Sequence, residues 1–140
     1  MKFLVGVLAA ALLTGCSSTP ISVREAVRAP ADEIYAFQSK PSRPYSTVTV
    51  LRDGGINASA CDFVIYIDGR RVAKLGTGEK ASFFIDPGQI NIGAGLAGSG
   101  LCSGQAIKTI GASAPAAKEI IFRVSSDMTG LTIGPYVDYR

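Results

Sequence analysis

The chain has 140 residues, which is the length of one domain, and 47% of them are hydrophobic, which is enough for a hydrophobic core. Its formal net charge of +3 excludes the strongly basic surface that binding to a phosphate backbone requires. The chain has no histidine, which excludes Ser-His-Asp and Cys-His catalytic arrangements.

Residues 1–15 have the layout of a secretory signal peptide. Lys2 supplies the cationic start, an apolar run extends from Phe3 to Leu13, and Thr14 and Gly15 are the small residues that precede a cleavage site. The apolar run is shorter than the roughly 20 residues that a transmembrane helix needs. We therefore expect export of the protein rather than a membrane span.

Leu13-Thr14-Gly15-Cys16 resembles the lipobox of bacterial lipoproteins. The resemblance implies cleavage before Cys16 and covalent attachment of a diacylglyceryl group and a further acyl chain, such as palmitate, to this residue, with no other cofactor. Ser17 at the next position implies sorting to the outer membrane, with the domain facing the periplasm. The alternative is an ordinary signal peptide in which the cysteine is incidental.

Cys61 and Cys102 are the other two cysteines of the chain. In an oxidising compartment an even number of cysteines indicates a disulfide, and closing a loop of about 41 residues would stabilise the fold by roughly 4 kcal/mol. The alternatives are two free thiols or a metal pair. Two cysteines with carboxylates are a poor ligand set for zinc, so no metal site is expected.

Residues 16–44 are expected to form a lipidated tether with short helical turns. Ser17 to Pro20 is a polar spacer that would lift the fold off the lipid. Ser22 and Glu25 match a capping box, which predicts a short helix over residues 23–29 that Pro30 ends.

A second helical turn can begin at Pro30 and run to Tyr35, and Ser39 to Pro44 is a linker because it contains two prolines. The aromatic residues of this region are Tyr35, Phe37 and Tyr45. They either anchor a partner or belong to a segment that folds back over the domain.

Residues 45–135 are expected to form the folded domain, followed by a tail over 136–140. The alternation of apolar and polar residues changes to a period of two, which is typical of strands. The predicted strands are 47–51, 62–67, 70–75, 81–85, 90–92, 105–110, 118–124 and 130–133. Asp68-Gly69 predicts a type I′ hairpin turn. Seven or eight short strands predict an all-β fold, a small antiparallel β-sandwich of immunoglobulin-like or transthyretin-like architecture.

Two stretches of the predicted domain carry a second resemblance. Tyr66-Ile67-Asp68-Gly69-Arg70-Arg71-Val72-Ala73 and Phe83-Phe84-Ile85-Asp86-Pro87-Gly88-Gln89-Ile90-Asn91-Ile92 are similar to the pattern of PEGA-type domains and of related bacterial lipoproteins with a small sandwich fold. The resemblance implies an extracytoplasmic structural or binding module without catalysis.

Residues 93–104 are predicted to be a flexible, glycine-rich loop that Cys102 pins. Gly93 to Gly98 matches G-x-G-x-x-G, but Ser99 and Gly100 follow where a dinucleotide site needs a helix, so no nucleotide is expected. If the loop protrudes, it could enter the cleft of a hydrolase or hold a small ligand.

Arg70, Arg71, Lys74 and Lys80 place four cations around one predicted hairpin. They are candidates for contact with an anion or with a partner, and a charged sheet edge that prevents aggregation explains them equally well.

These residues together favour a membrane-anchored lipoprotein that acts as a non-catalytic interaction or structural module of the cell envelope. Its expected partners are the membrane, through the lipid, and an envelope protein, and neither nucleic acid nor nucleotide is expected. The alternatives are an inhibitor or ligand-binding lipoprotein that uses the 93–104 loop, or an assembly component of a secretion or envelope machine. An enzyme is the weakest interpretation and would need a carboxylate pair from among Asp53, Asp62, Asp68 and Asp86.

Overall fold

A computed structural model describes residues 18–55, 60–103 and 106–138, and this part of the chain is all-β, without an α-helix. The predicted signal peptide and Cys16 lie outside the described residues. No helix among the residues that are described is long and apolar enough to cross a membrane.

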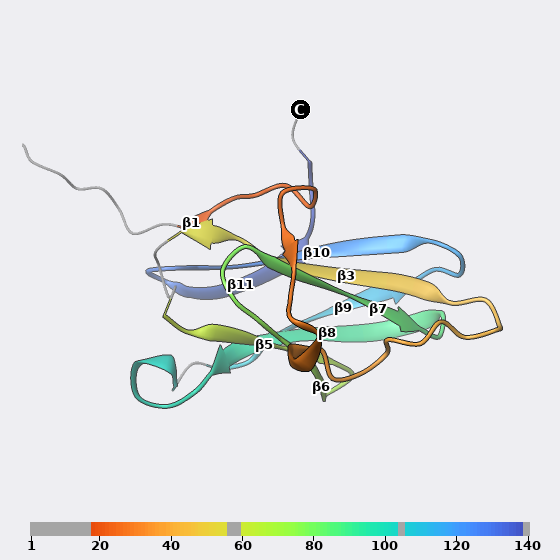
Figure 1. Cartoon of the computed structure of the whole chain (residues 1–140), viewed down its shortest axis with the longest axis horizontal. Coiled ribbons are helices and arrows are strands. Elements are labelled where there is room, and N and C mark those ends of the chain that lie inside the picture. The colour runs from red at the N-terminus through yellow and green to blue at the C-terminus, as the bar shows by residue number, and fades with distance from the viewer. Residues whose placement is uncertain (1–17, 56–59, 104–105, 139–140) are drawn as a thin grey trace, which may run out of the picture.

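The described residues form eleven strands in three sheets (Figure 1). One sheet has five strands in the order β11-β10-β3-β7-β2, the second has four in the order β6-β5-β8-β9, and β1 pairs with β4 alone. The strands are β1 (Ser18–Thr19), β2 (Val27–Arg28), β3 (Ser46–Arg52), β4 (Gly54–Gly55), β5 (Asp62–Ile67), β6 (Arg70–Leu75), β7 (Glu79–Ile85), β8 (Gly88–Ala97), β9 (Lys108–Ala114), β10 (Glu119–Asp127) and β11 (Gly130–Pro135). Two short 3₁₀ turns, η1 (Ala31–Glu33) and η2 (Gly100–Cys102), complete the described elements.

Each of the eight longer strands overlaps a strand predicted from the sequence, whereas β1, β2 and β4 have two residues each and were not predicted. The expectation of purely antiparallel pairing is wrong, because β10 runs parallel to β3 and β2 runs parallel to β7. A parallel pair needs a long connection. The chain between β3 and β10 provides one, since it builds all of the four-stranded sheet before it returns.

The two larger sheets share one hydrophobic core. Phe63 and Ile65 of β5 are fully buried, and so are Val48, Val50 and Phe83 of the five-stranded sheet. Within β7 every second residue points into this core, as the period of two predicts, whereas β3 is buried along almost its whole length. The core therefore fixes which face of each sheet is left to solvent.

The helix predicted over residues 23–29 is wrong. The capping-box hydrogen bonds do form, because the Glu25 amide donates to Ser22 Oγ over 3.3 Å and the Ser22 amide donates to the Glu25 carboxylate over 2.9 Å. They close a single turn, after which β2 joins the edge of β7. An isolated helix of this length is marginal in water, and the sheet edge offers backbone hydrogen bonds together with burial of Ala26 and Ala29.

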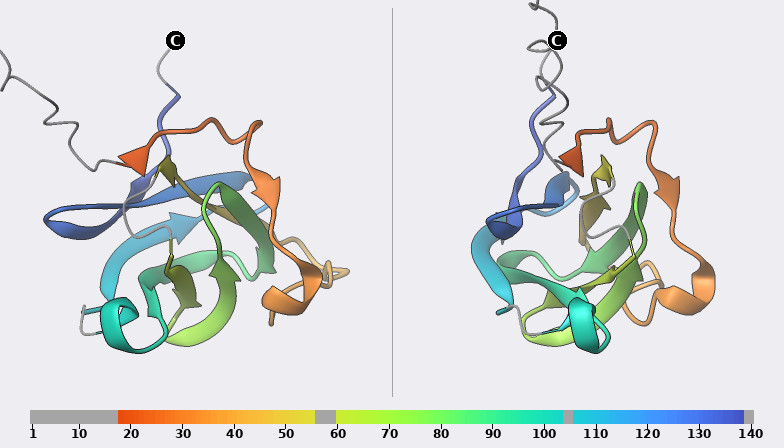
Figure 2. Two further views of the ribbon diagram at one scale, coloured as in Figure 1. Left: turned by 60° about the vertical axis from the view of Figure 1, so that its left-hand side comes forward. Right: turned by 90° about the vertical axis from the view of Figure 1, so that its left-hand side faces the viewer.

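The segment 27–38 lies along the edges of both larger sheets (Figure 2). The Ala29 amide donates to the carbonyl oxygen of Lys80 in β7 over 2.9 Å. The amide of Phe84, also in β7, donates to Phe37 O over 2.9 Å. Between these contacts the Tyr35 amide donates to Val72 O of β6 over 2.8 Å. The segment thus folds back over the domain and covers two edges that would otherwise expose unpaired backbone groups.

The loop predicted over residues 93–104 is wrong for its first half, because β8 continues to Ala97. A Cβ on Gly93 would lie 3.3 Å from Tyr66 Cβ, and one on Gly95 would lie 3.1 Å from Ile107 Cγ1. The glycines therefore make room for Tyr66 and Ile107 to pack across the strand. Among the described residues of this range, 98–103 remain as a loop, so residues 93–97 of the G-x-G-x-x-G match belong to β8 and Gly98 follows its end.

The fold has two distinct ends. We call the tether end the one where β3 and β10 both finish, which also carries β1, β4, residues 98–103 and the turn at 128–129, at the left of Figure 1. The opposite end, the far end, carries the hairpin turn at 68–69 and residues 86–87. Asp68 and Gly69 have φ angles of 48° and 77°, which confirms the predicted type I′ turn.

Candidate functional site

The first chain segment of the structure, residues 18–23, is bound to the tether end, and we call it the docked tether. In the β1–β4 pair Ser18 lies opposite Gly55 and Thr19 opposite Gly54. Beyond this pair, Lys80 Nζ donates to Val23 O over 2.6 Å. The hydroxyl of Tyr136 accepts a hydrogen bond from the Val23 amide over 3.3 Å.

Asp53 and Arg123 hold the middle of the docked tether. The Ile21 amide donates to Asp53 Oδ1 over 3.4 Å, and Arg123 Nη2 donates to Ile21 O over 2.7 Å. Arg123 Nε also lies 3.0 Å from Asp53 Oδ1 as an ion pair, and the Asp53 side chain is almost fully buried. Burial raises the pKa of Asp53, and the nearby charge of Arg123 partly opposes this change.

Sequence reasoning did not find this cluster. From the sequence, Asp53 was considered only as one of four carboxylates, and Tyr136 was placed in the tail. The Tyr136 amide donates to Ile121 O over 2.8 Å, and its ring lies 4.9 Å from the guanidinium carbon of Arg123. The signal that could have revealed the cluster is the charge of Arg123 within the apolar run from Ile120 to Val124, because a charge at such a position needs a partner.

The structure divides the four predicted cations. Lys80 binds the docked tether, and Lys74 forms ion pairs with Glu33 at 2.8 Å and Asp62 at 3.8 Å. The hydrogen bond with Lys74 is the main reason that the pKa of Glu33 is lowered, and the hydrogen bond with Glu33 raises the pKa of Lys74. Arg70 and Arg71 are exposed and lie beside the rings of Phe37 and Tyr35.

Four side chains form what we call the cation–aromatic edge: Tyr35, Phe37, Arg70 and Arg71. The guanidinium carbon of Arg70 lies 5.1 Å from the ring centroid of Phe37, and that of Arg71 lies 5.3 Å from the ring centroid of Tyr35. Both distances fall within the range of cation–π attraction. The tyrosine hydroxyl donates to the Glu33 carboxylate over 2.6 Å, which fixes the ring.

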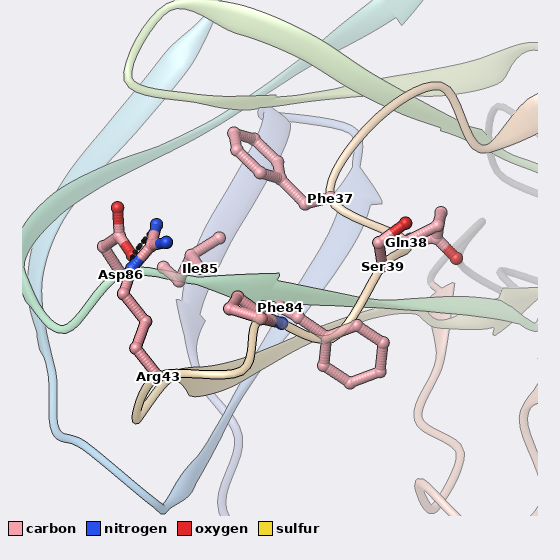
Figure 3. A pocket seen from close by; sticks show the side chains of 8 residues that line it. Phe37, Gln38, Ser39, Arg43, Phe84, Ile85 and Asp86 are labelled. Atoms are coloured by element: carbon pink, nitrogen blue, oxygen red, sulfur yellow. Dashed lines mark hydrogen bonds and ion pairs between the residues drawn. The ribbon is translucent and has the colours of Figure 1, made fainter.

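An open cavity of about 260 Å³ adjoins this edge on the side of the far end. Phe37 belongs to both, and Figure 3 shows the Arg43–Asp86 ion pair on one side of the cavity and Gln38 and Ser39 on the other. The ion pair has a distance of 2.7 Å, and both of its side chains are two-thirds exposed. The cavity can accept a small apolar group with polar neighbours. A second open cavity, near Tyr45 and Lys118 at the far end, has about 460 Å³.

The four aspartates considered for catalysis each have a different partner. Asp53 pairs with Arg123, Asp62 with Lys74, and Asp86 with Arg43, while Asp68 accepts a hydrogen bond from the Asn91 amide. Within the part of the chain that the structure describes, no group of three or more acidic, cysteine or histidine side chains is placed to hold a metal ion.

The predicted Cys61–Cys102 disulfide is confirmed, with a Cα–Cα distance of 5.4 Å. It joins the start of β5 to the loop over residues 98–103. Between Gly100 and Cys102 the loop turns through η2, and Leu101 is 98% exposed there.

These observations define the class as a disulfide-bonded all-β domain with a docked tether at one end and a cation–aromatic edge on one side. Comparison with known proteins finds no matching family model, no similar curated protein and no similar solved structure.

Proposed function

We propose that the protein is a lipid-anchored, non-catalytic interaction module of the bacterial cell envelope, held at the outer membrane and facing the periplasm. The lipobox resemblance at Cys16 supports the anchor, and a disulfide fits an exported protein. The cation–aromatic edge is the observation that carries the interaction role. Two sheets that share one core also support grouping the fold with small sandwiches of the immunoglobulin-like or transthyretin-like kind.

The composition of the edge suits a protein partner. Arginine, tyrosine and phenylalanine are enriched at interfaces, and arginine and tyrosine often carry much of their binding energy. Both guanidinium groups belong to exposed residues, and a guanidinium group presents several hydrogen-bond donors in one plane, so a partner with carboxylates is the complementary one. The adjoining cavity beside Phe37 would take an apolar side chain of the same partner.

The edge is also held in place before a partner arrives. Backbone hydrogen bonds on both sides of η1 attach the segment that carries Tyr35 and Phe37 to β6 and β7. Less conformational entropy is then lost on binding, which favours affinity. Because Arg70 begins β6 next to the far end, the edge lies away from the docked tether.

The anchor is tested by fractionation of cells. Cys16→Ala should release the protein from membranes, whereas Ser17→Ala keeps the cysteine and should stay bound. Ser17→Asp should move the protein to the inner membrane. Membrane attachment of the Cys16→Ala variant would contradict the anchor.

The interaction role is tested by crosslinking in cells with a photoreactive residue at position 35, followed by affinity purification. We expect one envelope protein at fixed stoichiometry, and its recovery should fall at least tenfold in Arg70→Glu/Arg71→Glu. Lys118→Glu reverses an exposed cation outside the edge and should leave the recovery unchanged. Equal losses in both variants, or recovery of abundant porins only, would contradict the role of the edge.

A further inference from the structure

The tether end carries the two most exposed large apolar side chains in the described part of the chain. Leu101 is 98% exposed and Met128 is 85% exposed. Leu101 lies on the disulfide-linked loop, and Met128 lies in the turn between β10 and β11. Scattered apolar residues are common on surfaces, but the two segments that carry these residues, η2 and the turn between β10 and β11, lie at the same end of the fold as β1 (Figures 1 and 2).

Chain length places this end close to the lipid. Ser17 is the single residue between Cys16 and Ser18. Two residue steps span at most about 7 Å, so the Cα atom of Ser18 lies within that distance of the acylated residue.

Because the docked tether is bound to the domain, residues 18–23 do not act as a flexible spacer between the domain and Cys16. Ser18 and Thr19 are paired with β4, and Ile21 and Val23 are held by the side chains of Asp53, Arg123, Lys80 and Tyr136. The expected polar spacer from Ser17 to Pro20 therefore does not lift the domain off the membrane while residues 18–23 stay docked.

We infer that the tether end rests directly on a phospholipid surface, with Leu101 and Met128 in its interfacial layer. This inference rests on the proposed lipid anchor and deepens it, since it assigns an orientation. Apolar side chains gain free energy in the boundary between headgroups and acyl chains, and the anchor keeps them there. The cation–aromatic edge then points along or away from the membrane, where a periplasmic partner can reach it.

The chain has no tryptophan, so a single introduced tryptophan reports its own surroundings. Leu101→Trp and Met128→Trp would be prepared as the acylated full chain and reconstituted into vesicles of phosphatidylethanolamine and phosphatidylglycerol with brominated acyl chains. Ala116→Trp is the matched control, because Ala116 is exposed between β9 and β10 at the far end. We expect a blue shift and quenching at positions 101 and 128 and neither at position 116.

Vesicle flotation in the same samples tests the lipid anchor separately from the orientation of the tether end. Flotation of all three variants with equal quenching at 101, 116 and 128 would overturn the orientation while leaving the anchor in place. Leu101 would then be free to enter the cleft of a protein partner instead. Failure of the acylated protein to float would overturn the anchor and the orientation together. A thermal unfolding temperature equal to that of the unsubstituted protein shows that each tryptophan variant is folded.

Discussion

The guanidinium carbon of Arg52 lies 3.8 Å from the ring centroid of Phe63. Nη1 of the same side chain donates to Cys61 O over 2.6 Å and to Leu75 O over 3.0 Å. Arg52 is the last residue of β3 in the five-stranded sheet. Its partners lie in the other sheet: Phe63 in β5, Cys61 directly before β5, and Leu75 in β6. One arginine that is only 2% exposed therefore joins the two sheets at the tether end. Burial lowers the pKa of Arg52, and the charges of Asp62 and Glu79 oppose that change.

Replacement of Arg52 by methionine should destabilise the fold by about 2–4 kcal/mol, because two buried carbonyl oxygens lose a charged donor. Urea unfolding of the two proteins, each with the additional Cys16→Ala change, measures the difference. Lys118→Ala, which truncates an exposed cation, should change the free energy of unfolding by less than about 0.5 kcal/mol. Similar values for the two variants would show that the contacts of Arg52 contribute little to the fold.

Loss of the Cys61–Cys102 disulfide should lower the free energy of unfolding by roughly 4 kcal/mol, because the unfolded chain regains the freedom of a loop with a sequence separation of 41. Unfolding in the presence and absence of a reductant measures the effect. The Cys61→Ser/Cys102→Ser variant is the control, since reductant should not change its stability further. Equal stability of the oxidised and reduced wild type would contradict a contribution of the disulfide.

The hairpin turn at the far end offers a test of backbone conformation alone. Gly69 has a φ angle of 77°, and a Cβ added there would meet no atom within 4 Å. Gly69→Ala should therefore destabilise the fold by about 1–2 kcal/mol through backbone strain without a clash. Gly134 has equal space and no positive φ, so Gly134→Ala should be neutral or slightly stabilising. Equal effects of the two changes on thermal unfolding would contradict this account.

Local patterns in the sequence were sufficient to predict the longer strands. The apolar run at 62–67 and the return at 70–75 coincide with β5 and β6, because the Asp68-Gly69 turn sets the register between them. The disulfide followed from the number of cysteines and the expected export. The hairpin depends on residues that are close in the sequence, and the disulfide prediction depends only on the number of cysteines.

Contacts between distant residues were not predictable in this way. Asp53 and Arg123 are far apart in the sequence and become neighbours only because β10 lies parallel to β3. The capping box at Ser22 and Glu25 forms as predicted, but the edge of β7 redirects the chain after one turn. Likewise, the glycines of β8 favour a loop in the sequence, but Tyr66 and Ile107 fill the space that side chains at Gly93 and Gly95 would occupy.

The buried carboxyl of Asp53 should make stability depend on pH. Because burial raises its pKa above the ordinary value of 3.8, the folded protein binds this proton more tightly than the unfolded chain does. The contribution of Asp53 to stability is therefore fully present below pH 3.8 and is lost as the pH rises through the pKa of the folded state. Urea unfolding of the wild type and of Asp53→Asn over this range measures it. We expect the asparagine variant to gain stability relative to the wild type as the pH rises.

Asp127 provides a control with the opposite sign. Hydrogen bonds from the hydroxyl and the amide of Thr129 lower the pKa of Asp127, so its contribution is present above the ordinary value of 3.8 and is lost as the pH falls through the folded-state pKa. The Asp127→Asn variant should therefore lose stability relative to the wild type as the pH rises. A fall in the relative stability of Asp53→Asn with rising pH would mean that the attraction of Arg123 outweighs burial. The docked tether would then be held by a net favourable ion pair rather than by the hydrogen bonds around a costly buried charge.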